Sequence, residues 1–110
     1  MEFDILQEQR GDLPLLRVRG ELDIYTAPRL KETVLAALNG GARSLAIDLS
    51  AVEFLDSTGL QVLMSAKKRT AERGGDVYLM GVGGQIRRVF NLLSLERIFK
   101  ICRESDLPTS

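Results

Sequence analysis

A carboxylate and two hydroxyls follow one another in the stretch Asp56-Ser57-Thr58-Gly59, directly after an apolar run. The pattern predicts that a helix begins at Asp56. The N-terminus of a helix carries about +0.5 of an elementary charge and free backbone N–H groups. A phosphoryl group on Ser57 would therefore be tolerated by its own helix, and it would add about −1.5 to −2 charge beside Asp56.

The same stretch has a purely structural interpretation. Asp, Ser and Thr are good N-cap residues whatever the function of a protein, so Asp56 is expected to cap the helix, with Ser57 merely in its first turn. Spacing alone favours the cap over a modification site. On the residues alone, both interpretations stay open.

The composition excludes several kinds of catalytic and metal chemistry. The 110 residues include no histidine and a single cysteine, Cys102. This excludes a Ser-His-Asp or Cys-His catalytic unit, a His-ligated metal and an intrachain disulfide. We expect no cofactor and no metal site, and we expect Cys102 to be a small core residue. Because 15 basic residues balance 15 acidic ones, no overall field draws the chain toward nucleic acid or an anionic membrane.

Hydrophobic periodicity predicts strands that alternate with helices. Strands are predicted at residues 3–9, 15–19, 44–49 and 77–80, and residues 98–102 fit either a closing strand or a helical turn. One helix is predicted from about Thr26 as N-cap, with Pro28 in its first turn, and two more from Asp56 and after Gly84. Apolar spacing predicts their buried faces: Leu30, Val34, Ala37 and Leu38; Leu60, Leu63, Met64 and Ala71; Ile86, Val89, Phe90 and Leu93.

This order of elements predicts an α/β fold. We expect a mixed, mostly parallel sheet with an antiparallel N-terminal strand and helices packed on it. The length fits a single domain over residues 1–110, with a core at about 3–101 and a short or disordered tail at 103–110. Loops at the carboxyl ends of parallel strands gather on one rim, where sites form. The loops expected there are residues 23–26, 50–58 and 81–84.

Three blocks of sequence resemble the STAS domain family, specifically the bacterial anti-sigma factor antagonists. Residues 56–60 (DSTGL) resemble the family's phosphoacceptor signature. Residues 20–23 (GELD), followed by Thr26 and Ala27, resemble its first strand-to-helix junction, and residues 86–90 (IRRVF) and 93–95 (LSL) resemble its third helix and the following turn. The blocks stand in the family's order and cover about residues 3–101.

The resemblance implies a protein-binding switch rather than an enzyme. In this family the unphosphorylated antagonist binds an anti-sigma factor, which then releases its sigma factor. The anti-sigma factor is often also a serine kinase that inactivates the antagonist, and a phosphatase reverses this. Carried over to this sequence, Ser57 is the phosphoacceptor, and the residues that line the contact rim are Asp23, Thr26, Asp56, Thr58 and Gly59.

The partners implied by the resemblance are an anti-sigma factor with serine kinase activity and a protein phosphatase, with no direct nucleic-acid binding and no membrane insertion. The lone cysteine and the absence of an export signal fit a cytoplasmic location. Members of the family usually close with an amphipathic C-terminal helix. Here residues 104–110 include Pro108, so that helix is expected to be short or absent.

The main alternative is a STAS domain that does not switch. Such a domain would be a scaffold or accessory subunit of a signalling assembly or of a membrane transporter. A phospho-receiver domain, with Asp48 or Asp56 as acceptor, would need an acidic pair after its first strand to hold magnesium, and the sequence shows none there. A small hydrolase or transferase would need a base better placed than Asp56 is beside Ser57.

The remaining motifs favour structural interpretations. The loop Gly81-Val82-Gly83-Gly84 matches neither GxGxxG nor a Walker A motif, so a flexible loop is expected there rather than a nucleotide site. The basic runs Arg87-Arg88 and Lys67-Lys68-Arg69 lack interleaved aromatic residues. They are expected to be solvated helix faces, although either could meet an acidic partner.

Overall fold

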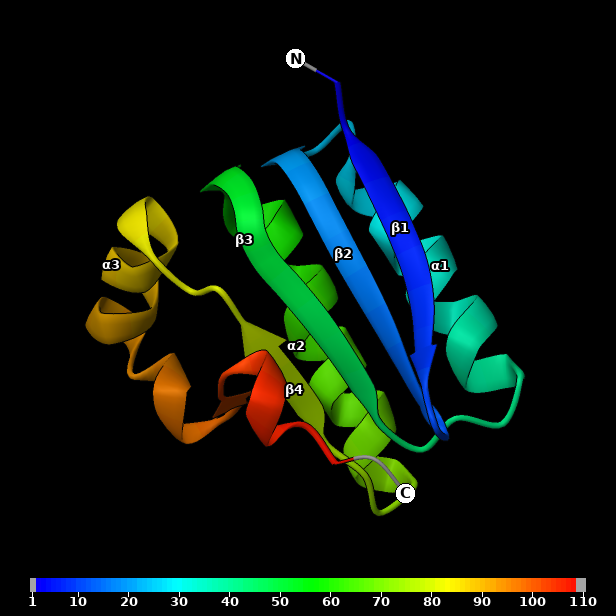
Figure 1. The fold of residues 1–110 in the computed structure, drawn as a ribbon. Coiled ribbons are helices and arrows are strands. Elements are labelled where there is room, and N and C mark those ends of the chain that lie inside the picture. Colours follow the sequence, from blue (N-terminus) through cyan, green and yellow to red (C-terminus); the bar gives the residue numbers. More distant parts are fainter. Residues whose placement is uncertain (1, 109–110) are drawn as a thin grey trace.

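A five-stranded sheet forms the centre of the fold in the computed structural model, which describes residues 2–108 (Figure 1). The strands lie in the order of the chain: β1 (Asp4–Arg10), β2 (Leu13–Leu22), β3 (Leu45–Leu55), β4 (Val77–Met80) and β5 (Lys100–Ile101). β1 pairs antiparallel with β2, and the other neighbours pair in parallel. The predicted α/β class, with an antiparallel first strand on a mostly parallel sheet, is confirmed.

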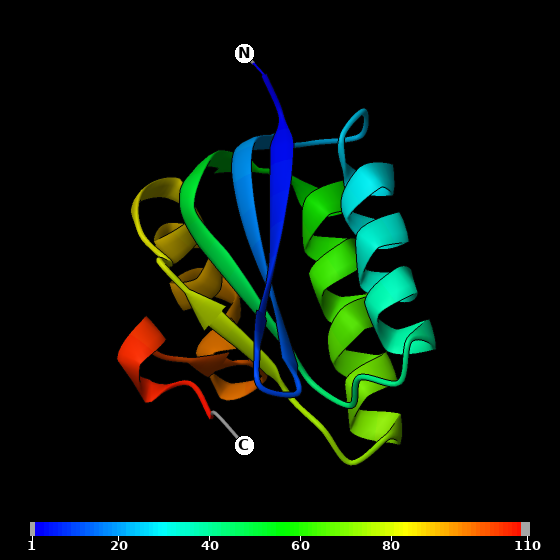
Figure 2. The same ribbon diagram turned by 45° about the vertical axis from the view of Figure 1, so that its right-hand side comes forward.

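Two helices cover one face of this sheet, as Figure 2 shows. They are α1 (Ala27–Asn39) and α2 (Ser57–Glu72). The third helix, α3 (Gly84–Leu93), packs beside the carboxyl half of β3, where the short β4 has ended. Leucines, valines and isoleucines of the helices and of the strand residues that face them form one buried cluster. A smaller cluster lies on the opposite, open face of the sheet.

The buried face of α2 differs from the prediction. Leu63 is buried as expected and Leu60 is half-buried, but Met64 and Ala71 are exposed. The buried positions are instead Gly59, Val62, Leu63, Ala66 and Thr70, which share one face at helical spacing. The prediction missed this face because Gly59 and Thr70 do not count as apolar residues, although both are buried there.

The strands β2 and β3 are longer than predicted. Expected to end at residues 19 and 49, they continue to Leu22 and Leu55 and stay paired to their ends. Two irregularities in their register disturb the alternation of apolar and polar residues on which the prediction depended. The expected loop at residues 50–58 is therefore wrong, because Asp56 alone separates β3 from α2.

The faces of α1 and α3 are largely as predicted. Leu30, Val34 and Leu38 are buried in α1, and Ile86 and Phe90 in α3, while Ala37 and Val89 are half-buried. Leu93 is exposed, contrary to the prediction. The reason is that α3 ends at this residue, and Ser94 takes a left-handed conformation (φ 55°) that turns the next leucine, Leu95, inward.

The end of the chain combines the two conformations that the sequence left open. A 3-10 turn at Leu95–Arg97 precedes the two-residue β5, and a second 3-10 turn follows at Glu104–Asp106. Residues 103–110 were expected to form a short or disordered tail. The described part of this segment contains the second 3-10 turn, and its Leu107 is buried. Residues 109 and 110 lie outside the described residues.

Candidate functional site

Asp56 caps α2, as the sequence predicts. Its Oδ1 accepts hydrogen bonds from the backbone N–H groups of Thr58 (2.9 Å) and Gly59 (3.1 Å), and also from the Thr58 hydroxyl. The Thr58 hydroxyl is the main cause that lowers the pKa of Asp56, with the backbone N–H groups adding to it against the cost of partial burial. The carboxylate therefore stays ionised and fixed at the helix start.

Ser57 and Thr58 are neighbours in the chain but differ in access. Ser57 is the first residue of α2 and is exposed. Thr58 is half-buried, and its hydroxyl donates to the Asp56 carboxylate. Of the two hydroxyls in the motif, that of Ser57 is the one presented to an approaching protein.

Gly59 lies beneath the surface rather than on it. It is buried, and a Cβ placed there would stand 2.8 Å from Leu55 Cδ1 and 2.9 Å from Leu22 Cβ. This glycine therefore allows the first turn of α2 to approach the ends of β2 and β3 closely. The expectation that Gly59 lines the contact rim needs correction, because burial leaves it a packing role under that rim.

The turn between β2 and α1 is braced from within. Asp23 Oδ1 accepts from the backbone N–H groups of Tyr25 (2.9 Å) and Thr26 (3.1 Å). The Thr26 hydroxyl accepts from Asp23 N–H (2.9 Å) and donates to the Glu21 carbonyl (2.6 Å). Thr26 occupies the N-cap position of α1, but its side chain makes no cap bond. The predicted N-cap position is confirmed, but the hydroxyl is engaged in the turn and does not cap the helix.

Two large apolar side chains project from this braced turn, and the sequence analysis missed both. Ile24 is 62% exposed and Tyr25 is 86% exposed. Phe54, two residues before the Asp56 cap, is 41% exposed. The available signal was an apolar pair set between two turn-forming polar residues, Asp23 and Thr26. Exposed aromatic and aliphatic residues held on a rigid turn are typical anchors of protein–protein contacts.

The structure brings the β2–α1 turn and the start of α2 together. Asp56 N–H donates to the Leu22 carbonyl (3.1 Å), directly before the turn. The Ile24 backbone N–H also contributes to lowering the pKa of Asp56. We call this surface the Ser57 rim and define it as residues 23–26, Phe54 and residues 56–58.

The third predicted loop, Gly81-Val82-Gly83-Gly84, begins farther from the Ser57 rim than the other two, because β4 ends earlier along the sheet than β2 and β3 do. β4 ends opposite Asp48, and Gly81 passes so close to Ser50 that a Cβ would lie 2.5 Å from its backbone nitrogen. The link to the Ser57 rim is the following residue, Gln85, which the sequence analysis missed. Its amide accepts from Leu55 N–H (3.1 Å) and donates to Leu55 C=O (3.0 Å), as a neighbouring strand would.

The other candidate residues have structural partners. Asp48, considered as a phosphoacceptor, pairs with Arg17. Lys67 pairs with Asp76. Cys102 is half-buried against the cluster on the open face, and burial raises the pKa of its thiol. Between residues 2 and 108 there is no helix of the length and apolarity that a membrane crossing requires.

The topology defines a small α/β domain with an exposed serine at a helix start at one end of its sheet. The chain belongs to the STAS domain family, whose model matches residues 4–107. The family resemblance noted in the sequence is thereby confirmed.

Known relatives agree with this assignment. The anti-sigma-B factor antagonist of Staphylococcus aureus (strain NCTC 8325 / PS 47) is 31% identical over 86 residues, which cover 78% of this chain and 80% of the relative. An anti-sigma factor antagonist of known structure from Mycobacterium paratuberculosis is 32% identical, with a TM-score of 0.81 over 91% of this chain and 85% of its own. A Thermotoga maritima structure is 31% identical, with a TM-score of 0.87 over 93% of this chain and 89% of its own.

Proposed function

We propose that this chain is an anti-sigma factor antagonist whose binding to its anti-sigma factor is switched off by phosphorylation of Ser57. The observation that carries the proposal is the exposed Ser57 at the first position of α2, beside the fixed Asp56 carboxylate and a braced turn with exposed apolar side chains. Relatives at 31% and 32% identity are named as antagonists of this class. We also propose a cytoplasmic location for the chain, because the proposed partners control a sigma factor there.

Six residues of the Ser57 rim have distinct parts in the proposed contact. Ile24 and Tyr25 supply apolar area that a partner would bury, and Asp23 and Asp56 supply negative charge. Thr26 holds the Asp23 carboxylate through its backbone N–H, and Thr58 holds the Asp56 carboxylate through its hydroxyl and its backbone N–H. A surface of this kind binds a partner with basic residues around an apolar pocket, because opposite charges at the edge of an interface favour association.

Phosphorylation would change the charge of this surface strongly. It adds about −1.5 to −2 charge where Asp56 already provides one negative charge. The phosphate is tolerated by the N-terminus of α2, so the fold is kept. A partner that docks here, however, would have to bury a strongly hydrated phosphate, and any acidic group it brings would be repelled by that phosphate. The proposed partners are accordingly an anti-sigma factor with serine kinase activity, which adds the phosphate, and a phosphatase, which removes it.

The choice of Ser57 over Thr58 follows from access. A kinase must place the acceptor hydroxyl in line with the γ-phosphate of ATP, which requires a free and mobile hydroxyl. The Thr58 hydroxyl is half-buried and donates to Asp56, so transfer to it would first break the cap of α2.

Intact-mass measurement with the candidate anti-sigma kinase and ATP tests the acceptor. The wild type and a Thr58→Val control should each gain one phosphate, and Ser57→Ala should gain none. An equal gain in Ser57→Ala would overturn the assignment.

Binding to the anti-sigma factor tests the switch. The phosphorylated chain should bind at least about tenfold more weakly than the unphosphorylated chain, a loss of about 1.4 kcal/mol, with an unchanged circular dichroism spectrum. Equal binding would instead support a STAS scaffold that does not switch.

A further inference from the structure

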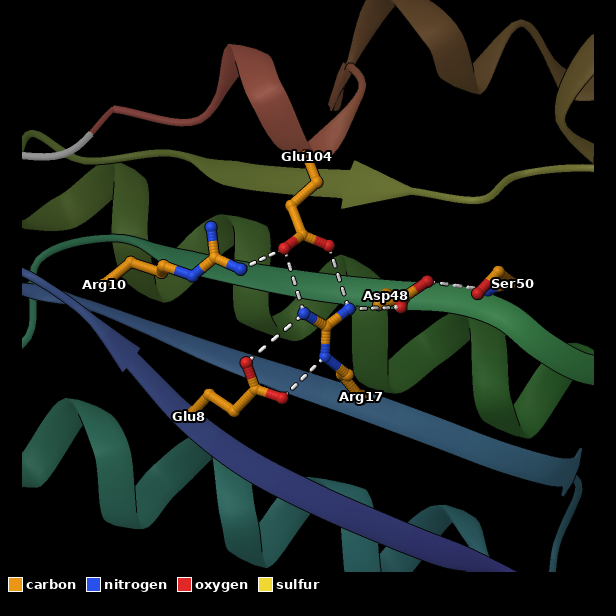
Figure 3. A network of polar contacts seen from close by, with 6 residues as sticks. All are labelled: Glu8, Arg10, Arg17, Asp48, Ser50 and Glu104. Atoms are coloured by element: carbon orange, nitrogen blue, oxygen red, sulfur yellow. Dashed lines mark hydrogen bonds and ion pairs between the residues drawn. The ribbon is translucent and has the colours of Figure 1, made fainter.

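The open face of the sheet carries a cluster of charged side chains centred on Arg17 of β2 (Figure 3). Its guanidinium donates to Glu8 from Nε (2.7 Å) and from Nη2 (3.3 Å), and to Asp48 from Nη1 (2.9 Å). The same group donates from Nη1 and Nη2 to the two carboxylate oxygens of Glu104 (3.0 Å each). Arg10 also pairs with Glu104. The five N–H donors of Arg17 therefore all have partners.

Glu104 reaches this cluster from outside the sheet. Glu8, Arg10, Arg17 and Asp48 belong to β1, β2 and β3, whereas Glu104 begins the 3-10 turn near the end of the chain. The four strand residues already balance two positive charges with two negative ones. The attraction of the cluster for a further carboxylate depends on the paired geometry of the arginine, not on excess charge.

Leu107 anchors the same segment at a second point. It is 6% exposed, and it packs in a cluster with residues that all face the open side of the sheet, Leu13, Leu15, Ala46 and Met80. Leu15 and Ala46 are 0% exposed although α1 and α2 lie on the other face. Residues three apart in a 3-10 helix lie on the same side, so Glu104 and Leu107 meet the sheet together. Ser105 and Asp106 between them are exposed.

Residues 103–108, which we call the strap, thus bind the sheet as a short peptide would. One end is a carboxylate held by Arg10 and Arg17, and the other is a leucine packed in the apolar cluster of the open face. We propose that the open face is a peptide-recognition site that the strap occupies in cis. We propose further that this site accepts a segment of another polypeptide bearing a glutamate and a leucine three residues apart in one helical turn.

This site is separate from the Ser57 rim and does not depend on the proposed switch. A segment in trans competes with the strap, so its apparent affinity equals its intrinsic affinity multiplied by the fraction of molecules in which the strap is released. The strap has the advantage of its connection to β5, which gives it a high effective concentration. Weakening the strap without shortening the chain should therefore expose the site to a free peptide.

The test uses the full chain with the substitutions Glu104→Gln and Leu107→Ala, labelled with nitrogen-15. The probe is a synthetic peptide with the sequence of residues 103–110 (RESDLPTS). We expect saturable shifts of the backbone amides of Leu13, Leu15 and Arg17 in the doubly substituted chain. The wild type should need at least about tenfold more peptide for the same shifts, because its strap is in place.

Two controls sharpen the result. A peptide with the same two substitutions should produce no saturable shifts, and a chain with Ser105→Ala should behave as the wild type, since that side chain is exposed. The proposal is overturned if the doubly substituted chain fails to bind the peptide at millimolar concentration, or if both peptides bind equally. Should circular dichroism show that this chain is unfolded, the single substitution Leu107→Ala carries the same test.

Discussion

The Ser57 rim and the open face of the sheet each contain a fixed carboxylate, but the two carboxylates are held in different ways. On the Ser57 rim, Asp56 is satisfied by N–H and O–H groups two and three residues away in the chain. On the open face, Glu104 is satisfied by Arg17, which is 87 residues away. The first arrangement is built mostly by the helix start, with a contribution from the Ile24 N–H of the β2–α1 turn, and it leaves Ser57 free. The second exists only after the sheet has formed, and it ties the end of the chain to that sheet.

The comparison has a consequence for what each region can do. A carboxylate fixed by its own helix can remain in place while a partner docks or a phosphate is added beside it. A carboxylate fixed by a distant arginine can be replaced by another carboxylate, because the site that holds it is preformed by the strands. The Ser57 rim is therefore suited to modification, and the open face to exchange.

The largest expected effect concerns the packing beneath the Ser57 rim. Gly59→Val should lower the free energy of unfolding by about 3 kcal/mol, because the added carbons meet Leu22 and Leu55 at the strand ends. Urea denaturation of the pure chain measures this loss.

Gly83→Val is the matched control, since a Cβ at Gly83 has no neighbour within 4 Å. Its cost should stay below about 1 kcal/mol. Equal losses in the two variants would show that Gly59 is not required for the close approach of α2.

The apolar anchor of the strap gives the next largest effect. Leu107→Ala should lower the free energy of unfolding by about 2 kcal/mol, at the lower end for a buried leucine because the cluster on the open face is small. Thermal denaturation followed by circular dichroism is sufficient to measure it. The exposed Leu93 is the control, and Leu93→Ala should change stability by no more than about 0.5 kcal/mol. A strap that contributes no stability would make the two variants indistinguishable.

The contrast between local and distant contacts also explains how much of these two regions could be predicted from the sequence. The capping of α2 by Asp56 was predictable because its partners, Thr58 and Gly59, lie within three residues. The pairing of Arg17 with Glu104 was not, because it needs the register of β1, β2 and β3 and the path of the chain after β5. The order of elements was predictable from hydrophobic periodicity. The full length of β3 was not, because irregular pairing with β2 broke that period.

The role of small residues was the other limit of prediction. Gly59 was assigned to the contact rim because it belongs to the sequence motif. Its role in the fold is to let α2 pack closely against Leu22 and Leu55, which a side chain at this position would prevent. Ile24 and Tyr25 were overlooked because a turn is expected to be polar, although the braced backbone holds both side chains in solvent. Both errors concern whether a residue is exposed or buried, which periodicity does not determine inside a turn or at a helix start.

A smaller effect separates the cap of Asp56 from its charge. Asp56→Ala removes the acceptor of two backbone N–H groups and should lower the free energy of unfolding by about 1 kcal/mol. Asp56→Asn keeps a good capping oxygen and should recover most of that loss. If the asparagine variant is as unstable as the alanine variant in chemical denaturation at neutral pH, the charge, not the hydrogen bonds, holds the helix start.

The smallest effect is the pH dependence of that same charge. The pKa of Asp56 is lowered on folding, mainly by the Thr58 hydroxyl, so the folded state binds its proton less readily than the unfolded chain does. Its contribution to stability is therefore complete above the ordinary pKa of an aspartate, and it is lost as the pH falls through the lowered value in the folded state. The difference in stability between the wild type and Asp56→Asn should be constant from about pH 7 to pH 5 and should shrink below about pH 4. Denaturation curves of both chains across this range measure this difference.

The pKa of Glu104 is lowered as well, by Arg17 first and then by Arg10, so the stability difference between the wild type and Glu104→Gln should also shrink at low pH. The pair of Arg17 and Glu104 is half-exposed and joins two charges, whereas Asp56 is held by uncharged N–H and O–H donors. We therefore expect 0.5 M salt to weaken the pH dependence contributed by Glu104 more than that of Asp56. An equal response to salt would mean that the two carboxylates are held in the same way after all.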